Sequence, residues 1–557
     1  MGQNSTNARS PQPNAHEEFL LGHLKDLGYL TGKDIHDKLI SHFDVSSETA
    51  RKITQRAVAK GLMRSSKPYT FGNKQYVYYK FGNVLGKEEV KSITKTERPP
   101  VYRLITAIEE NKGIISYYEA LKITASPVSN SSSKISTLED ILSLLTGLKL
   151  AYVLTDTNGV KYIIERNADP SLPTDNEESL MRAHYSKMVV DCTFLPDIVR
   201  WLQQANLVGE NAPVYRNRST PSLGARHNNF MWDAFAYTRT TGINELVGVK
   251  KAAKQDAQTF VPLDVVLSRE YSEVELDGFV SRVQVVIQSV KLGRRKVLPI
   301  IIYRAISPVT KRKIRSLGFL SIDIASIFGK HVHTLLEHIR QMQLSKREGF
   351  GGNGQTVDEM LALIEKMGQG TGLRTLRGIL FEYLMYPLVK TIYPNAKIQQ
   401  GVKIPKTVIN LVDDADDVNN ANKAKEYFEY DFIVESSNPS ELVIIEAKGY
   451  AKGHQFSLGP WDKKGTVKWF FGNSFKSAKT HYEGIFGGAT KITGCFITSS
   501  GFTKEASEWL DKPSNSGLKP KHLELSYDRQ KLFELLEEYD FSHIRQIVDQ
   551  YYITEED

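Results

Sequence analysis

The spacing of apolar residues predicts a helix and then a pair of strands in the last third of the chain. Residues 373–391 carry leucines at intervals of four, which is typical of one face of a helix: Leu376, Leu380, Leu384 and Leu388. Residues 442–445 are instead a continuous apolar run, which indicates a strand that is covered on both faces. Asn438-Pro439 precedes this run and predicts a turn, because proline ends a strand ladder. Residues 430–450 are therefore expected to form a β-hairpin.

Three charged residues lie at one end of this hairpin. Glu446 and Lys448 follow the apolar strand, and residues two apart on a strand point to the same face. Asp431 lies on the first strand, so the hairpin brings the two carboxylates together. Two carboxylates can bind Mg²⁺ and leave positions open for water and phosphate, and the bound metal acidifies that water. The alternative is a salt-bridged hairpin end in an unrelated domain.

Asp431, with Glu446-Ala447-Lys448 closing an apolar strand, resembles the D…ExK signature of the PD-(D/E)XK nuclease superfamily, which includes many restriction endonucleases. The resemblance implies a Mg²⁺ cofactor, with Mn²⁺ as a substitute, held by Asp431 and Glu446. It also implies that Lys448 positions or activates the attacking water. Family members often carry an acidic residue on the helix before the hairpin. Glu382 matches that place as a further catalytic residue, and its alternative is a surface glutamate.

The segments after the hairpin follow the order of the superfamily core. Residues 491–499 predict a buried strand, and residues 503–510 predict a helix. Between the hairpin and this strand, residues 463–482 mix aromatic with basic side chains. We expect the aromatic side chains to be buried, and we keep contact of Lys476 and Lys479 with DNA phosphates as a hypothesis.

Residues 16–97 predict three helices and two strands. The helices are expected over residues 16–27, 33–43 and 48–60, and the strands near residues 62–64 and 75–79. This order resembles a winged helix-turn-helix, whose third helix enters the DNA major groove. The resemblance places four residues of the third helix and two of the wing against DNA: Arg51, Lys52, Gln55, Arg56, Lys67 and Lys74. The alternative is a winged helix that contacts protein.

Residues 98–166 resemble a second, weaker winged helix. Helices are expected over residues 101–108, 117–123 and 136–148, followed by a hairpin around Asn158-Gly159. The third of these helices is acidic and apolar, so we interpret this copy as a spacer or packing module. Residues 167–178 predict a linker.

Residues 179–330 repeat the C-terminal plan, and we interpret them as a degenerate PD-(D/E)XK-like domain without catalysis. Residues 228–237 are expected to be a helix, and residues 282–290 an apolar strand. The matched positions are Asp233 for Glu382, Asp264 for Asp431, and Gln288-Ser289-Val290 for Glu446-Ala447-Lys448. The alternative is an unrelated α/β domain.

Composition adds several limits. The 557 residues suffice for about three to five domains, and 41% hydrophobic with 24% charged residues is typical of globular proteins. The formal net charge is +8, but residues 51–100 hold twelve Lys or Arg against three Glu, which suits a polyanionic partner.

Two cysteines, Cys192 and Cys495, exclude a cysteine-based zinc site and a disulfide framework, and they suit a reducing cytoplasm. No apolar run of about 18 residues predicts a membrane span. Residues 1–15 predict a disordered tail, and residues 331–372 a helical and glycine-rich linker.

The sequence therefore predicts a multidomain α+β and α/β protein with tandem winged helices, a degenerate nuclease-like domain and an intact nuclease domain over residues 373–557. We interpret it as a cytoplasmic, Mg²⁺-dependent DNA endonuclease of restriction or anti-phage defence, with DNA as its partner and no membrane contact. Double-strand cleavage would need a homodimer or two successive nicks, and a partner protein of the defence system stays open. The alternatives are a nuclease acting on RNA or branched DNA, and a non-enzymatic DNA-binding regulator or assembly subunit.

Overall fold

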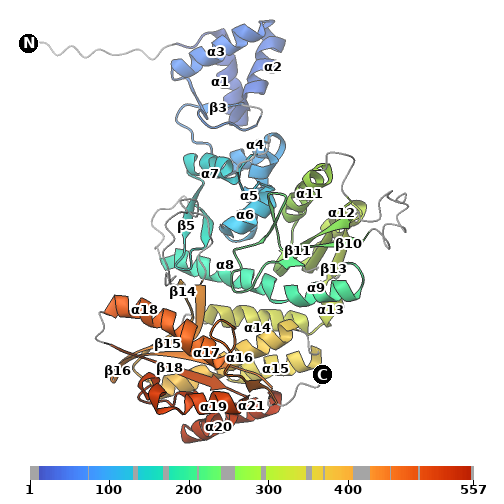
Figure 1. Cartoon of the computed structure of the whole chain (residues 1–557). Coiled ribbons are helices and arrows are strands. Elements are labelled where there is room, and N and C mark those ends of the chain that lie inside the picture. Colours follow the sequence, from blue (N-terminus) through green and yellow to red (C-terminus); the bar gives the residue numbers. More distant parts are fainter. Residues whose placement is uncertain are drawn as a thin grey trace, which may run out of the picture. The chain divides into compact units, whose positions relative to one another are not determined.

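The protein is a mixed α+β, multidomain chain (Figure 1). The computed structural model describes residues 12–72, 75–129, 136–166, 175–209, 213–239, 258–289, 296–345, 354–367, 371–405, 427–451, 453–486 and 490–552. The chain divides into two compact units, the first made of residues 1–188 and 202–322, the second of residues 189–201 and 323–557. Within the described ranges, no helix is both long enough and apolar enough to cross a membrane.

The first module of the first unit contains three helices and a three-stranded sheet. Its elements are α1 (Ala15–Leu27), β1 (Tyr29–Thr31), α2 (Gly32–Phe43), α3 (Ser47–Ala59), β2 (Met63–Ser65) and β3 (Val77–Lys80). The three predicted helices and both predicted strands are confirmed, whereas β1 has no counterpart in the prediction. The sheet order is β1-β3-β2. The Ser46 hydroxyl caps α3 by accepting a hydrogen bond from the Thr49 backbone N–H at 3.3 Å.

The loop between β2 and β3 packs against the next module. Phe71 is buried in one cluster with residues of helix α4 (Lys87–Glu97). The Arg98 guanidinium donates a hydrogen bond to the Thr70 carbonyl at 3.1 Å. Gly72, at φ 116°, approaches the Glu97 backbone so closely that a Cβ would lie 2.2 Å from the Glu97 carbonyl oxygen. The loop is thereby fixed to α4.

The second module repeats the element order of the first. It consists of α5 (Pro99–Glu110), β4 (Ile114–Ser116), α6 (Tyr117–Thr124), α7 (Leu138–Gly147), β5 (Ala151–Thr155) and β6 (Lys161–Glu165). The sheet order, β4-β6-β5, is again first, third, second. The predicted helices and hairpin are confirmed. Of the predicted linker, residues 167–174 lie outside the described residues, and the remainder begins helix α8 (Asp175–Thr193).

The third part of the first unit is a five-stranded sheet with order β13-β12-β11-β10-β7. Strand β10 is antiparallel to β7 and β11, whereas β12 runs parallel to β11. The chain passes through α9 (Leu195–Gln204), β7 (Val214–Tyr215), β8 (Ala225–His227), β9 (Phe230–Trp232), β10 (Ala234–Arg239), β11 (Gln258–Tyr271), α11 (Glu273–Gln288), β12 (Ile300–Ile306), α12 (Pro308–Ser316) and β13 (Leu320–Asp323).

Two predictions for this region are wrong. Residues 228–237 form strands β9 and β10 rather than a helix, and residues 282–290 lie largely in helix α11 rather than in a strand. The β-branched run in α11 resembles a strand, but its buried residues recur at helical intervals, at Phe279, Val283 and Val286. The helix begins where the Glu275 carboxylate accepts the Ser272 backbone N–H at 2.9 Å.

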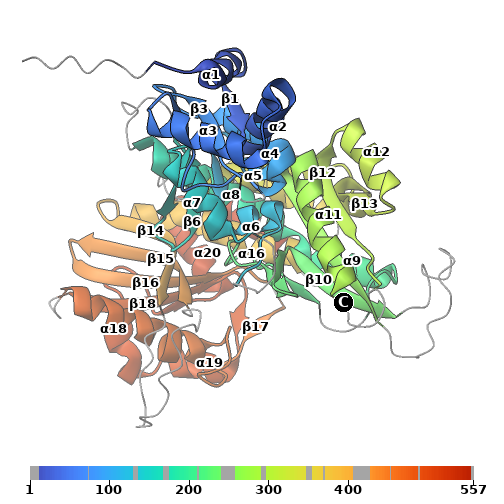
Figure 2. The same cartoon turned by 90° about the horizontal axis from the view of Figure 1, so that it is seen from above.

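The second unit is built on a sheet of order β14-β15-β16-β18-β20, whose first four strands can be followed in Figure 2. Strands β14, β15 and β16 are antiparallel neighbours, and β18 and β20 run parallel to β16. The strands are β14 (Lys397–Pro405), β15 (Tyr427–Ser437), β16 (Ser440–Lys448), β18 (Lys491–Thr498) and β20 (Ser526–Tyr527), with the small pair β17 (Gln455–Phe456) and β19 (Gly501–Phe502). The predicted hairpin, its Asn438-Pro439 turn and the strand after it are confirmed.

Helices flank this sheet. They are α13 (Ile324–Phe328), α14 (Val332–Ser345), α15 (Gly354–Met367), α16 (Thr371–Ile392), α17 (Val467–Trp469), the π-helical turn η1 (Phe470–Ser474), α18 (Phe475–Phe486), α19 (Lys504–Leu510), α20 (Arg529–Glu538) and α21 (Ser542–Tyr551). Trp469, Phe470 and Phe471 are buried, as predicted. Helices α14 and α15, expected in a linker, belong to this compact unit. Tyr383 of α16 donates a hydrogen bond to the Met342 carbonyl of α14 at 3.1 Å.

Candidate active site

Asp431, Glu446 and Lys448 meet at one end of the central sheet of the second unit. The Lys448 Nζ lies 2.8 Å from Asp431 Oδ2 and 2.7 Å from Glu446 Oε1. The Ala447 backbone N–H donates a further hydrogen bond to Asp431 Oδ2 at 2.7 Å. The sequence prediction that these three charged side chains come together is confirmed.

The hairpin register produces this arrangement. Phe432 of β15 pairs with Ile445 of β16, so one step further along the ladder Asp431 stands opposite Glu446. The residues of β16 from Glu441 to Ala447 are all buried, as expected for an inner strand that is covered on both faces of the sheet. The apolar run therefore holds the two carboxylates in place, and Lys448 is the first residue of β16 that regains access to solvent, at 27% exposed.

Burial controls the ionisation of these groups. It raises the pKa of the Glu446 carboxyl to about 7, against the opposing effect of the Lys448 charge, and the charge of Asp431 adds to the increase. Burial alone would lower the pKa of Lys448, but the charges of Asp431 and Glu446 raise it well above its ordinary value. Lys448 is therefore an ammonium group at neutral pH, and Glu446 is poised between its two forms.

Glu382 lies on α16, as expected, and α16 packs against β16. Its charge is among those that raise the pKa of Lys448, and its neighbour Phe381 lies against Gly449, the residue after Lys448. Gly449 makes this approach of α16 feasible. A Cβ at Gly449 would lie 2.4 Å from the Cβ of Phe381, the neighbour of Glu382. The sequence indicated the helix and its glutamate, but not the need for a glycine next to Lys448.

The first unit holds a second carboxylate pair at the equivalent place. Its sheet has the strand plan of the second unit: two antiparallel steps, then a helix crossover to a parallel strand. Ala234 pairs with Leu263, so Asp233 stands opposite Asp264 as Asp431 stands opposite Glu446. The Val265 backbone N–H donates to Asp233 Oδ2 at 2.9 Å, which repeats the bond from Ala447 to Asp431.

This finding corrects the sequence-based match between the two regions. Asp233 corresponds to Asp431 and not to Glu382, and Asp264 corresponds to Glu446 and not to Asp431. The position of Lys448 is taken by Val266. The predicted counterpart of the ExK triplet, Gln288-Ser289-Val290, begins at the end of a helix, and its last residue lies outside the described residues.

Three cations surround this second pair. Lys122, from α6, binds Asp233 and lies 2.8 Å from Asp264 Oδ1. Arg216 and Arg282 reach Asp233 and Asp264 at 3.1 Å and 3.2 Å. All five side chains are at most 8% exposed. Burial lowers the pKa of Lys122, but the charges of Asp233 and Asp264 outweigh this and raise it. Three cations thus enclose the second pair, whereas within the described part of the chain Lys448 alone forms ion pairs with the carboxylates of the hairpin.

The predicted DNA-binding residues lie on the surface of the first module. Arg51, Lys52, Gln55 and Arg56 of α3 are exposed, as is Lys67 between β2 and β3. Lys52 forms a surface ion pair with Glu48 at 2.8 Å. Lys74 lies outside the described residues. Lys60, at the end of α3, instead pairs with the buried Glu17 at 2.8 Å and so has a structural role.

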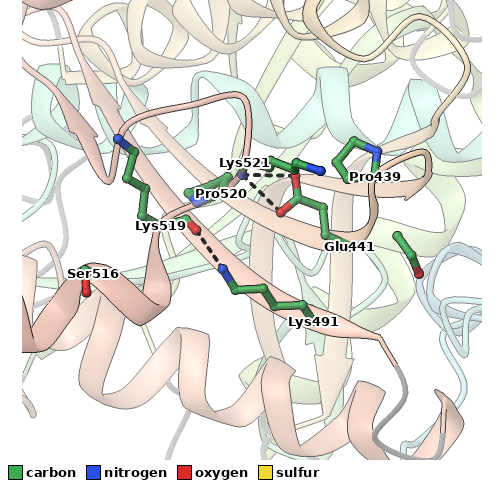
Figure 3. Close-up of a pocket in the computed structure, with 8 residues that line it drawn as sticks. Pro439, Glu441, Lys491, Ser516, Lys519, Pro520 and Lys521 are labelled. Carbon is green, nitrogen blue, oxygen red and sulfur yellow. Dashed lines mark hydrogen bonds between the residues drawn. The ribbon is translucent and has the colours of Figure 1, made fainter.

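A pocket of about 390 Å³ opens at the other end of the same strands (Figure 3). Lysines line it together with Glu441, whose carboxylate accepts the Lys521 backbone N–H at 3.2 Å. Glu441 lies at the amino end of β16, and Glu446 near its carboxyl end. The lining residues are Pro439, Ser440, Glu441, Lys491, Ser516, Lys519, Pro520 and Lys521. The pocket is thus separate from the carboxylate pair.

Comparisons with protein families, with curated proteins and with solved structures all returned no match.

Proposed function

We propose that this protein is a metal-dependent nuclease that hydrolyses DNA phosphodiesters at Asp431, Glu446 and Lys448, in a PD-(D/E)XK-like domain formed by the second unit. One observation carries the proposal. The Lys448 Nζ lies within 2.8 Å of both the Asp431 and the Glu446 carboxylate, at the end of a hairpin that is followed by a helix and a parallel strand. This is the arrangement that the D…ExK signature implies.

The donor set fits Mg²⁺ or Mn²⁺. Mg²⁺ binds through one or two carboxylates and completes its shell with water and phosphate oxygens. Glu446 Oε2 is buried and has no hydrogen-bond partner among the described residues, which leaves it available as a ligand. The two hydrogen bonds to Asp431 both end on Oδ2. Among the described residues, no group of three or more His, Cys, Asp or Glu side chains could hold an ion alone, so water or substrate must supply the remaining ligands.

The residues then have distinct roles. A bound metal would supply an acidified water and charge neutralisation at the phosphate. Asp431 and Glu446 would hold it as carboxylates, so metal binding would shift Glu446, whose pKa is raised to about 7, toward its ionised form. Lys448 keeps its proton, because its pKa is raised, so it orients the water or a phosphate oxygen as a hydrogen-bond donor rather than accepting the proton. Glu382 supports the site from α16.

Two features of the first unit favour DNA as the substrate. Its first module has the helix and strand order of a winged helix, and α3 presents four exposed polar or basic side chains: Arg51, Lys52, Gln55 and Arg56. Such a helix can enter the major groove. The module behind it holds the loop around Phe71, so it acts as a support for the wing. The enclosed pair Asp233–Asp264 serves the stability of the first unit and not catalysis.

Plasmid cleavage tests the proposal. Purified protein should nick or cut supercoiled plasmid with Mg²⁺ and not with EDTA, and Asp431→Asn and Lys448→Met should each abolish the reaction. Glu435→Gln is the matched control, because Glu435 lies on the same strand and is exposed. Loss of cleavage in the control, or unchanged cleavage in both site variants, would remove the assignment. Binding without cleavage under all these conditions would favour a DNA-binding regulator.

A further inference from the structure

Two exposed aromatic side chains follow the catalytic triplet closely in the chain. Tyr450 comes two residues after Lys448 and is 40% exposed, and Trp461 is 64% exposed. Most aromatic residues of this unit are buried in its core, among them Trp469, Phe470 and Phe471. An exposed tryptophan beside charged groups is typical of a surface that binds a flat ligand.

Tyr450 is held in a fixed place. Its backbone N–H donates to Ser499 Oγ at 2.8 Å, and the same hydroxyl donates back to the Tyr450 carbonyl at 2.6 Å. The ring stacks on His454, with centroids 4.3 Å apart and planes 17° from parallel, and meets Phe456 edge-on at 5.2 Å. The Ser499 backbone N–H also donates to the Lys448 carbonyl at 3.2 Å, so the exposed part of the ring is presented on a rigid base that is bonded to Lys448.

The loop that carries Trp461 is also ordered. The Thr466 hydroxyl lies 3.1 Å from the Pro460 carbonyl and 3.0 Å from the Lys463 carbonyl, and it caps the helix that follows by accepting the Trp469 N–H at 3.2 Å. Gly459, at φ 56°, approaches Thr466 so closely that a Cβ would lie 2.4 Å from its methyl group. The loop is thus closed on itself, with Trp461 on its outside.

Basic residues accompany the two rings. Lys463, Lys464 and Lys468 are exposed, with Asp462 as the one acidic residue between Trp461 and Lys468. The loop begins directly after β17, whose Phe456 packs edge-on against Tyr450, and the charge of Lys464 is among the groups that lower the pKa of the Glu446 carboxyl. Aromatic rings interleaved with lysines suit a nucleic-acid strand, because bases stack on the rings and phosphates pair with the ammonium groups.

We propose that Tyr450 and Trp461 form a stacking platform for unpaired bases, so that the preferred substrate has a single-stranded segment next to the cleaved phosphodiester. This inference rests on the proposed nuclease function for its catalytic part, but not for its binding part. A duplex keeps its base faces stacked inside and cannot use the platform. An overhang, a gap or an unwound strand can.

Binding without cleavage tests the platform. Labelled oligonucleotides would be titrated with full-length protein in EDTA: single-stranded DNA, single-stranded RNA, blunt duplex, and duplex with a 3′ or 5′ overhang. Trp461→Ala and Tyr450→Ala should each weaken binding of the single strand and the overhangs about tenfold and leave the blunt duplex unchanged, while Trp461→Phe should retain most of the affinity. Ile485→Ala, an exposed apolar residue at 60% on α18, is the control.

The outcomes separate the two proposals. If the aromatic variants lose equal affinity for single-stranded and duplex DNA, or if neither variant loses affinity, the platform is overturned even if plasmid cleavage succeeds. A Trp461-dependent preference for single strands in a protein that never cuts supports the platform and counts against the nuclease. If the aromatic variants lose affinity for single-stranded RNA but not for single-stranded DNA, the platform binds RNA rather than DNA.

Discussion

Replacing Lys122 and Lys448 separately with methionine should have different consequences, although each lysine bridges two carboxylates. Lys122→Met removes an ammonium group from a pair that is almost completely buried. Losing one member of a buried ion pair costs about 3–5 kcal/mol. Because Arg216 and Arg282 remain on Asp233 and Asp264, we expect the lower end, about 3 kcal/mol.

Lys448→Met should be milder in the metal-free protein. Lys448 is partly exposed, and Glu446, whose pKa is raised to about 7, can take up a proton and relieve its repulsion with Asp431. We expect a loss of about 1.5 kcal/mol, as for one hydrogen bond to a charged group. Mg²⁺ at about 100 times its Kd would return about 2.7 kcal/mol through binding to the folded state alone.

Differential scanning calorimetry with and without Mg²⁺ measures both effects. Lys122→Met should lower the transition of the first unit by about 6 °C, at about 2 °C per kcal/mol for a unit of this size, and Mg²⁺ should not restore it. Lys33→Met, on an exposed lysine of the same unit, should stay within about 0.5 kcal/mol of the parent. A Tm of Lys122→Met within about 1 °C of the parent, or its recovery with Mg²⁺, would refute the view that the second pair is a sealed structural cluster.

Three further predictions follow from other contacts. The double variant Arg51→Ala/Arg56→Ala should weaken binding of duplex DNA and reduce the slope of log K against log salt concentration by about 2. Fluorescence anisotropy at several NaCl concentrations measures both quantities. Lys25→Ala, on an exposed lysine of α1, should change neither. Gly449→Ala should destabilise the second unit by about 1–3 kcal/mol through its collision with Phe381, whereas Gly453→Ala, with open space around it, should be neutral in the same urea titration. Mn²⁺ affinity should rise about tenfold from pH 6 to pH 8, because the carboxyl group of Glu446, with a pKa of about 7, must be ionised to bind metal. Titration calorimetry should find this rise abolished in Glu446→Gln. A Mn²⁺ affinity of the parent protein that does not change with pH would contradict the assignment of Glu446 as a ligand.

The site of the second unit could be predicted because its chemistry is local. Asp431, Glu446 and Lys448 lie on one hairpin, so strand periodicity and one turn were enough to bring them together. The cluster around Asp233 could not be predicted in this way. Lys122 is 111 residues away from Asp233 in the sequence and lies on a helix of another module. The spacing of residues does not predict a contact over such a separation.

The errors in the middle region have a similar origin. The run that includes Val283 and Val286 is rich in β-branched residues, so composition favoured a strand, while the start signal of the helix lay upstream at Ser272 and Glu275. Because the prediction makes that run the counterpart of the strand that carries Glu446, it matches Asp264 one strand too early. The correct match depends on the pairing of β10 with β11, which is a property of the folded sheet.

The path of the chain between its two units limits how the protein can be divided. Residues 189–201 belong to the second unit although the chain afterwards returns to the first until residue 322. Within the second unit, Phe194 is fully buried and contacts Phe328 with ring centroids 5.1 Å apart. A fragment that begins at Asp323 lacks Phe194 and its neighbours, so it would expose to water the apolar surface that they cover. The second unit should be prepared with residues 189–201 supplied as a peptide or by circular permutation, and it could not be exchanged between proteins by a single crossover.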